Sequence, residues 1–171
     1  VECDLLFIHK FVILHMICRC TRWHAAKIVP NKDEDTLSET VDEIWVGLHG
    51  PMKELFIDGE TGLVISELSN TYFRRKGIKL RPKAKDQHAH YIERRGALTR
   101  HQVHLTEAQL EAEGLKVPFK YILSEAVFCG NALLAVNDST PYNAVYGRVP
   151  RVLPSIDQIQ EPNSSEEPLP G

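Results

Sequence analysis

Residues 3–29 read CDLLFIHKFVILHMICRCTRWHAAKIV and contain three apolar, β-branched stretches, DLLFI, FVILHMI and HAAKIV. Short polar breaks separate these stretches at His9–Lys10 and Thr21–Arg22. Apolar runs of this length between polar breaks are typical of β-strands. The segment therefore predicts three consecutive strands, with Asp4 inside the first of them.

After residue 30 the sequence alternates between helical and strand patterns. A capping-box pattern, Thr36-x-x-Glu39, predicts the start of an amphipathic helix that ends at Gly50–Pro51 and turns inward Leu37, Val41, Ile44, Trp45 and Leu48. The run KELFID predicts a buried strand that ends at Asp58. Further predicted elements are a helix over 64–76, a short strand IKL, and helices over 87–101, from Thr106, and over 119–136.

This order of elements, βββαβαβα followed by helices, predicts one α/β domain with a mixed five-stranded sheet flanked by helices. The domain is expected to occupy residues 1–153. Residues 154–171 are rich in Pro, Ser and Glu and bury too little apolar surface to offset the entropy of ordering. We therefore expect a mobile tail there.

The charge of the chain is unevenly distributed. The formal net charge is −3, but four of the 23 acidic residues and none of the 20 basic ones lie from Asp157 onward, so the preceding residues carry +1. A basic run occupies twelve positions and comprises Arg74, Arg75, Lys76, Lys79, Arg81, Lys83 and Lys85. This clustering favours a local electropositive face that suits nucleic acid.

The apolar and cysteine patterns bear on location. The longest apolar run, residues 11–18, is far shorter than the roughly 20 residues that span a bilayer, so no membrane anchor is expected. The four cysteines lack the spacing of a disulfide-rich secreted domain, which favours an intracellular setting. Because the chain begins at Val1, inside a predicted strand, we expect it to be a segment of a longer precursor.

Three acidic residues fall where they can converge on a metal ion. Asp4 lies in the first strand, Asp58 ends the fourth, and Glu93 lies in the helix after the fifth. In a mixed sheet built in this order, we expect the first and fourth strands to be neighbours. Carboxylates gathered in this way suit hard divalent cations such as Mg²⁺.

These residues and their spacing resemble the integrase cores of retroviruses and copia-type retrotransposons, which have a ribonuclease H-like fold. Asp4 and Asp58 are 54 positions apart, and Asp58 and Glu93 are 35 apart, close to the intervals of that family. Gln87 and the pair Glu93–Arg94 also match family positions. The segment VILHMICRCTRWHAAKIVPNKD is similar to the family's second and third strands, and TPYNAVYGRVP to its Thr-Pro-Tyr and Gly-Arg-x-Pro ending.

The resemblance implies a metal-dependent polynucleotidyl transferase that trims the 3′ ends of element DNA and joins them to target DNA. Two Mg²⁺ or Mn²⁺ ions would be held in one active site. Asp4 would bind both ions, Asp58 would complete the binding site of one ion, and Glu93 that of the other. The implied partners are element and target DNA and further copies of this chain. If the source is eukaryotic, the implied location is the nucleus or a cytoplasmic particle, and the precursor would be a polyprotein.

Candidate phosphate contacts lie in the basic run and on the Glu93 helix. They are Arg74, Arg75, Lys79, Lys83, Lys85, Gln87, Arg94 and Arg100. A merely solvated basic surface is the alternative for each of them.

His15, Cys18, Cys20 and His24 raise a zinc alternative. They are predicted to lie along strands rather than at the turns that structural zinc sites use, so buried free cysteines are favoured and no zinc is expected in this segment. His88 and His90 are expected to face solvent or DNA.

Two other functions remain open from the sequence. The sequence departs from the family's pattern around the second and third acids, at Gly59, Glu60, Ala89 and His90. These departures keep open the alternative of a catalytically silent, domesticated module that binds DNA or protein. Ribonuclease H proper is the second alternative, although the Thr-Pro-Tyr ending speaks against it.

Overall fold

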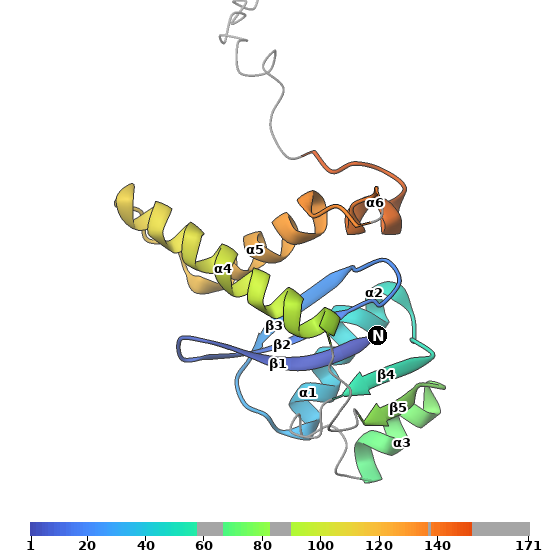
Figure 1. Ribbon diagram of the computed structural model, residues 1–171. Coiled ribbons are helices and arrows are strands. Elements are labelled where there is room, and N and C mark those ends of the chain that lie inside the picture. The colour runs from blue at the N-terminus through green and yellow to red at the C-terminus, as the bar shows by residue number, and fades with distance from the viewer. Residues whose placement is uncertain (58–66, 83–89, 137, 152–171) are drawn as a thin grey trace, which may run out of the picture.

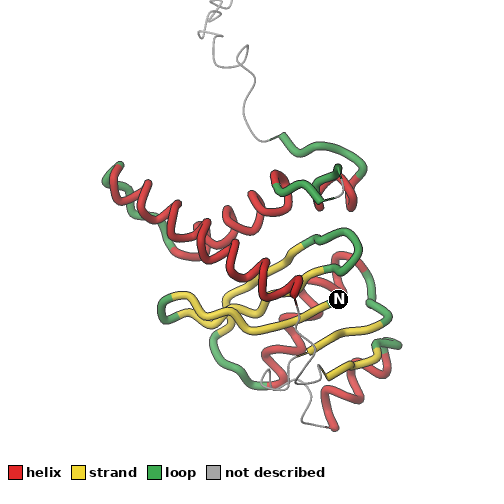
Figure 2. Tube along the Cα trace, in the orientation of Figure 1, coloured by secondary structure: helices red, strands yellow, loops and turns green. Residues whose placement is uncertain are grey.

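The protein is described here from a computed structural model that covers residues 1–57, 67–82, 90–136 and 138–151, apart from the side chains of residues 67–70 and His90. The predicted mobile tail, residues 154–171, lies outside the described residues. A five-stranded mixed sheet forms the centre of the molecule, and helices cover both of its faces (Figures 1 and 2). The strands are β1 (Glu2–Ile8), β2 (Phe11–Ile17), β3 (His24–Val29), β4 (Glu54–Ile57) and β5 (Lys79–Pro82).

The strand order across the sheet is β3-β2-β1-β4-β5. β1, β2 and β3 form an antiparallel meander, whereas β4 pairs with β1 and β5 with β4 in parallel. The prediction of three consecutive strands is confirmed, and so is the prediction that the first and fourth strands are neighbours. The coarse α/β class with a five-stranded mixed sheet is therefore correct.

One face of the sheet carries an apolar core. Cys3, Leu14 and Met16 point to this side and pack with Leu37, Trp45 and other residues of a helical segment, and with Phe73. The helical segment comprises α1 (Glu34–Val41), a π-helical turn η1 (Asp42–Val46) and α2 (Gly47–His49), and Phe73 belongs to α3 (Glu67–Arg75).

The capping-box prediction for this segment is wrong. Its N-cap is Asp33, and Thr36 lies inside the first turn, where its carbonyl oxygen accepts a hydrogen bond from the Thr40 hydroxyl at 2.7 Å. Leu48, predicted to face inward, is 71% exposed, because the π-helical turn rotates the residues after it away from the stripe set by Leu37.

The opposite face of the sheet is covered by α4 (His90–Ala112) and α5 (Phe119–Leu133), as Figure 1 shows. Leu6, Ile8 and Ile13 pack there against Val103 of α4 and Ile122 of α5, with further residues of α5 around them.

A separate helix from Thr106 was predicted and does not exist. Thr106 lies within α4, and its hydroxyl donates to the Gln102 carbonyl at 3.0 Å, so the residue continues the helix instead of capping a new one.

The segment TPYNAVYG forms α6 (Pro141–Tyr146), a short helix with a signal at each end. Thr140 is the N-cap, and its hydroxyl oxygen accepts from the Asn143 amide at 3.2 Å. Gly147 ends the helix in the left-handed conformation, at a φ of 66°. The rings of Tyr142 and Tyr146 lie against Trp23, which attaches α6 to the turn between β2 and β3.

Candidate functional site

Two of the three predicted acidic residues lie in the described part of the chain. Asp4 is half-buried in the middle of β1, and Glu93 is exposed in the first turn of α4. Asp58 lies outside the described residues. It directly follows Ile57, the last residue of β4, which pairs with Cys3 next to Asp4.

Alternation along β1 places the Asp4 side chain on the α4 face of the sheet. Glu2 and Leu6, two residues to either side, both contact α4 from this face. The Glu2 carboxylate accepts a hydrogen bond from the Ile92 amide at 3.0 Å, and the Leu6 side chain lies against Gly96, 3.4 Å from where a Cβ would be. Asp4 therefore lies beneath the first two turns of α4, the part that carries Glu93.

Glu2 fixes the start of α4 on the sheet. Its side chain is only 1% exposed; Oε2 accepts from the Ile92 amide, and Oε1 accepts from Arg19 Nε at 2.7 Å. The Arg19 guanidinium also lies over the Phe56 ring of β4, 3.7 Å from its centroid. One buried carboxylate thus links β1, the turn after β2, β4 and the α4 N-terminus, where its negative charge also complements the helix dipole.

Glu2 was not among the functional residues predicted from the sequence. Its signal was present, because Glu2 and Asp4 are two apart in a predicted strand and so share a face. A buried carboxylate needs a hydrogen-bond donor. The donor to Glu2 is the amide of Ile92, 90 residues away, which the local sequence pattern cannot reveal.

The helical position of Glu93 turns it toward β1. Ile92, Gly96 and Val103 face the sheet, and the stripe beside them contains Glu93, Arg100, His104 and Glu107. Arg100 Nη2 reaches the Phe7 carbonyl at 3.4 Å, and Glu107 contacts His9 in the β1–β2 turn. Glu93 lies on this β1 side at the end nearest Asp4.

The local environment of the two acids suits oxygen-liganded cations. Asp4 Oδ1 accepts the Leu5 amide at 2.8 Å, and Asp4 is paired in register with His15 across the β1–β2 ladder. Glu93 is exposed and forms no hydrogen bond or ion pair with the described residues. Carboxylate oxygens on a rigid strand and a helix start fit Mg²⁺ or Mn²⁺.

The other flank of α4 is held by a buried polar network. Arg95 Nη2 donates to Asn131 Oδ1 of α5 at 2.8 Å, and Asn131 also accepts the His24 amide and donates to the His24 carbonyl. The His24 ring contacts the His15 ring, with Nε2 and Nδ1 3.3 Å apart. This network joins β2, β3, α4 and α5.

Burial shapes the titration of the network. Desolvation lowers the pKa of His24 well below its ordinary value, with further lowering by nearby His15 and Arg95, so His24 is neutral. Desolvation also lowers the pKa of Arg95 to about 10, and this side chain stays charged at neutral pH. Among the described residues no carboxylate pairs with Arg95, and its Nε atom has no hydrogen-bond partner.

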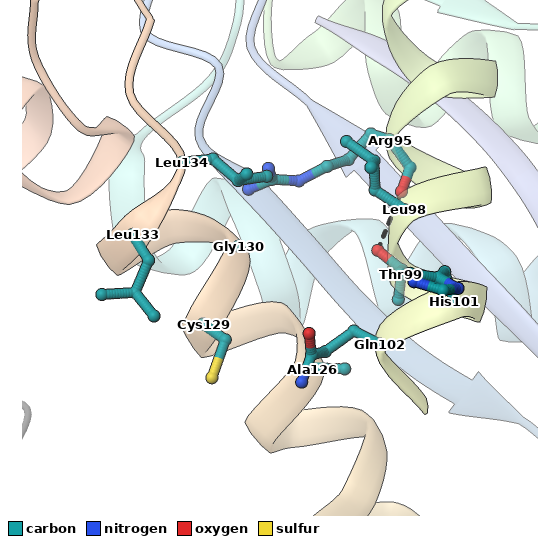
Figure 3. Close-up of a pocket in the computed structure, with 10 residues that line it drawn as sticks. All are labelled: Arg95, Leu98, Thr99, His101, Gln102, Ala126, Cys129, Gly130, Leu133 and Leu134. Carbon is teal, nitrogen blue, oxygen red and sulfur yellow. Dashed lines mark hydrogen bonds between the residues drawn. The ribbon is translucent and has the colours of Figure 1, made fainter. Parts of the chain in front are cut away.

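Arg95 crosses the gap between α4 and α5, as Figure 3 shows, beside a cleft of about 140 Å³. Gly130 makes room for it: a Cβ there would lie 3.0 Å from the guanidinium carbon. The Thr99 hydroxyl donates to the Arg95 carbonyl at 2.9 Å, within α4 (Figure 3). Arg95 thus positions α4 against α5, on the flank away from Asp4.

The predicted phosphate contacts are only partly brought together. Arg74, Arg75, Lys79 and Arg94 are exposed, whereas Lys83, Lys85 and Gln87 lie outside the described residues. Within the basic run, Lys76 is paired with Asp42, and Arg81 with Glu54 at 3.0 Å. Arg74, Arg75 and Lys79 belong to α3 and β5 at one edge of the sheet, and Arg94 and Arg100 to α4.

Of the residues weighed as a zinc site, His15 and His24 lie on strands as predicted, whereas Cys18 and Cys20 do not. β2 ends at Ile17, so Cys18 and Cys20 lie in the turn rather than on one face of a strand; Cys20 is exposed and Cys18 half-buried. His15 and His24 instead belong to the buried network. His90 begins α4, its side chain is not described, and His88 lies outside the described residues.

Comparison with models of known protein families and with curated protein sequences finds no match. The resemblance to integrases therefore rests on the sequence motifs alone. No helix in the described ranges is both long and apolar enough to cross a membrane.

Proposed function

We propose that this chain is the catalytic core of an integrase of the retroviral and copia type, with a ribonuclease H-like fold. It would trim the 3′ ends of element DNA and join them to target DNA. The observations that support the proposal are that β1 presents Asp4 on the face of the sheet that α4 covers, and that buried Glu2 binds the Ile92 amide in the turn of α4 that carries Glu93. The parallel pairing of β1 with β4 supports a place for Asp58 at the same edge.

In the proposed site, Asp4, Asp58 and Glu93 would hold two Mg²⁺ or Mn²⁺ ions, which supply a nucleophile at neutral pH and offset charge on the transferring phosphate. Asp4 provides a ligand from the central strand of the sheet, where it pairs with His15 of β2 and the adjoining Cys3 pairs with Ile57 of β4. Glu93 provides one from a helix start whose dipole favours an anion. Pre-positioned carboxylates require little reorganisation when DNA binds.

The exposed basic residues provide the DNA-binding surface of the proposal. Arg74, Arg75 and Lys79 extend from the β5 edge of the sheet, and Arg94 projects from α4 next to Glu93. Each cation that contacts a phosphate releases counterions and adds to the salt dependence of binding. A second copy of the chain would be needed to act on two element ends.

The test is a joining assay on labelled duplex DNA with recessed 3′ ends and a supercoiled plasmid target, in Mg²⁺ or Mn²⁺. We expect joined product from the unaltered protein, and a loss of at least about 1000-fold in Asp4→Asn, Asp58→Asn and Glu93→Gln. Glu111→Gln, an exposed acid near the far end of α4, is the matched control and should keep full activity. Equal activity in all forms contradicts the site.

Metal and DNA binding separate the alternatives. Calorimetric titration with Mn²⁺ should show binding that Asp4→Asn and Glu93→Gln weaken. A protein that binds DNA but neither binds Mn²⁺ nor joins ends is the catalytically silent module. Cleavage of the RNA strand of a hybrid duplex without joining identifies a ribonuclease H.

The proposed DNA-binding surface is tested by measuring how DNA affinity depends on salt concentration. The combined variant Arg74→Ala, Arg75→Ala, Lys79→Ala and Arg94→Ala should lower the slope of log affinity against log salt by up to about 3 to 4. Lys27→Ala is the control. Lys27 lies on β3, at the opposite edge of the sheet, and is paired with Glu43. An unchanged slope in the combined variant places the DNA elsewhere.

A further inference from the structure

A second group of metal-ligating side chains lies away from Asp4 and Glu93. His9 belongs to the turn between β1 and β2, and His104 and Glu107 lie one turn apart on α4. One ligand atom from each residue falls within 4.8 Å of the others. No other group of three His, Cys, Asp or Glu residues in the described ranges meets this condition.

The distances are close to those of a coordination shell. His9 Nε2 lies 3.0 Å from both Glu107 oxygens, and His104 Nδ1 lies 3.4 Å from Oε2. Ligands about 2.0 to 2.1 Å from a tetrahedral Zn²⁺ are about 3.3 Å from one another. The ligand nitrogens of the two imidazoles lie within 4.8 Å of each other, and both side chains are exposed and can rotate to adjust this distance.

The backbone and the neighbouring rings hold His9 in this position. His9 has a φ of 51°, a left-handed conformation that is uncommon for a residue other than glycine. Its ring meets His104 and Phe119 edge to face, with centroids 5.6 and 5.9 Å apart. His104 and Glu107, three apart on a helix, extend from the same side of α4.

We propose that His9, His104 and Glu107 form a binding site for one zinc-like transition-metal ion, with a fourth position open to water. Two imidazoles and one carboxylate suit Zn²⁺, Co²⁺ or Ni²⁺, whereas Mg²⁺ prefers oxygen ligands alone. This departs from the expectation, drawn from the sequence, that the segment holds no zinc.

The site fastens the tip of the β1–β2 hairpin to the middle of α4. His104 lies 11 residues after Glu93, which is about 16 Å along the helix, so the bound ion takes no part in chemistry at Asp4. It is independent of the proposed function, because none of its ligands belongs to the acidic set. Bound metal would stabilise the hairpin and α4 against local opening.

The test uses ZnSO₄ and CoCl₂ on the whole chain in excess MgCl₂, with calorimetry for Zn²⁺ and absorption spectroscopy for Co²⁺. We expect one ion per chain, a rise in the melting temperature with Zn²⁺, and a visible Co²⁺ spectrum without the near-ultraviolet band of thiolate ligands. His104→Ala and Glu107→Gln should each weaken Zn²⁺ binding by about 100-fold. His104 is exposed and Glu107 is partly exposed, and circular dichroism checks that the variants fold.

Two controls make the result decisive. His101→Ala removes an exposed histidine one turn away on α4, and Cys20→Ser removes the exposed thiol; neither should change Zn²⁺ affinity. Zn²⁺ affinity that is unchanged in His104→Ala and Glu107→Gln, or that is lost in Cys20→Ser, overturns the proposal. So does a Co²⁺ spectrum with a thiolate band.

Discussion

The two faces of the sheet are built differently. On the α1 and α3 face, the buried residues are mainly apolar, with Thr40 of α1 among the few buried polar ones. On the α4 and α5 face, buried Glu2, His15, His24, Arg95 and Asn131 accompany a smaller apolar cluster. Apolar packing tolerates small shifts, whereas hydrogen-bonded buried groups fix distance and angle. The proposed site needs α4 in one place, to set Glu93 against Asp4, and the face that α4 covers carries most of the buried polar groups.

Of the changes to the buried polar groups, the removal of the Glu2 side chain should have the largest effect on stability and on DNA joining. Glu2→Ala leaves the Ile92 amide without its acceptor and Arg19 without its carboxylate, so we expect the free energy of unfolding to fall by about 3 kcal/mol. DNA joining should fall further than folding alone explains, because Glu93 loses its positioning. Denaturant unfolding and the joining assay below the unfolding transition measure the two effects.

Leu37→Ala is the control on the apolar face. It removes a fully buried side chain and should cost about 2–5 kcal/mol, yet leave the joining rate of the folded fraction unchanged. Glu2→Gln keeps an acceptor for the Ile92 amide and should recover part of the loss. If Leu37→Ala and Glu2→Ala lower joining by the same factor per folded molecule, Glu2 has no positioning effect.

Two substitutions at Arg95 distinguish the effect of its charge on stability from the effect of its packing. Arg95→Met removes a desolvated cation and keeps its volume, so the free energy of unfolding should stay within about 1 kcal/mol or rise. Arg95→Ala should lower it by about 2 kcal/mol, because the cleft between α4 and α5 enlarges. Equal losses in both variants, from urea unfolding, would mean that the Arg95–Asn131 hydrogen bond itself is essential.

Gly130 tests how tightly Arg95 is held. A Cβ at Gly130 would lie 3.0 Å from the guanidinium, which Asn131 holds, so Gly130→Ala should cost about 1 kcal/mol despite the better helix propensity of alanine. In the Arg95→Met background the same change should instead stabilise by up to about 1 kcal/mol. The coupling energy of about 2 kcal/mol is read from a double-mutant cycle. Additive effects would show that Arg95 moves freely.

The same contrast explains how much the sequence could predict. β1, β2 and β3 follow from local apolar patterns with turns at His9 and Arg22, and the β1–β4 adjacency follows from element order. The continuity of α4 through Thr106 could not be predicted, because a threonine before polar residues resembles an N-cap until its hydroxyl partner is known. The His24–Asn131 hydrogen bonds join residues 107 apart and have no local signal. Asp58, the remaining acid, lies outside the described residues, so its position stays a prediction.

Burial of His24 on the polar face should also make stability depend on pH. Burial lowers the pKa of folded His24 well below 6.5, whereas the unfolded chain titrates near 6.5, so below that pH only the unfolded state gains the proton. Stability from this group is complete well above pH 6.5 and falls as the pH drops below 6.5, with a slope that approaches about 1.4 kcal/mol per pH unit while folded His24 stays neutral. Urea unfolding between about pH 7.5 and 5.5 measures it. His24→Gln should flatten this part of the curve, and exposed His101→Gln should not; equal curves for all three proteins would show that His24 is protonated in the fold and that the polar face accommodates a further charge.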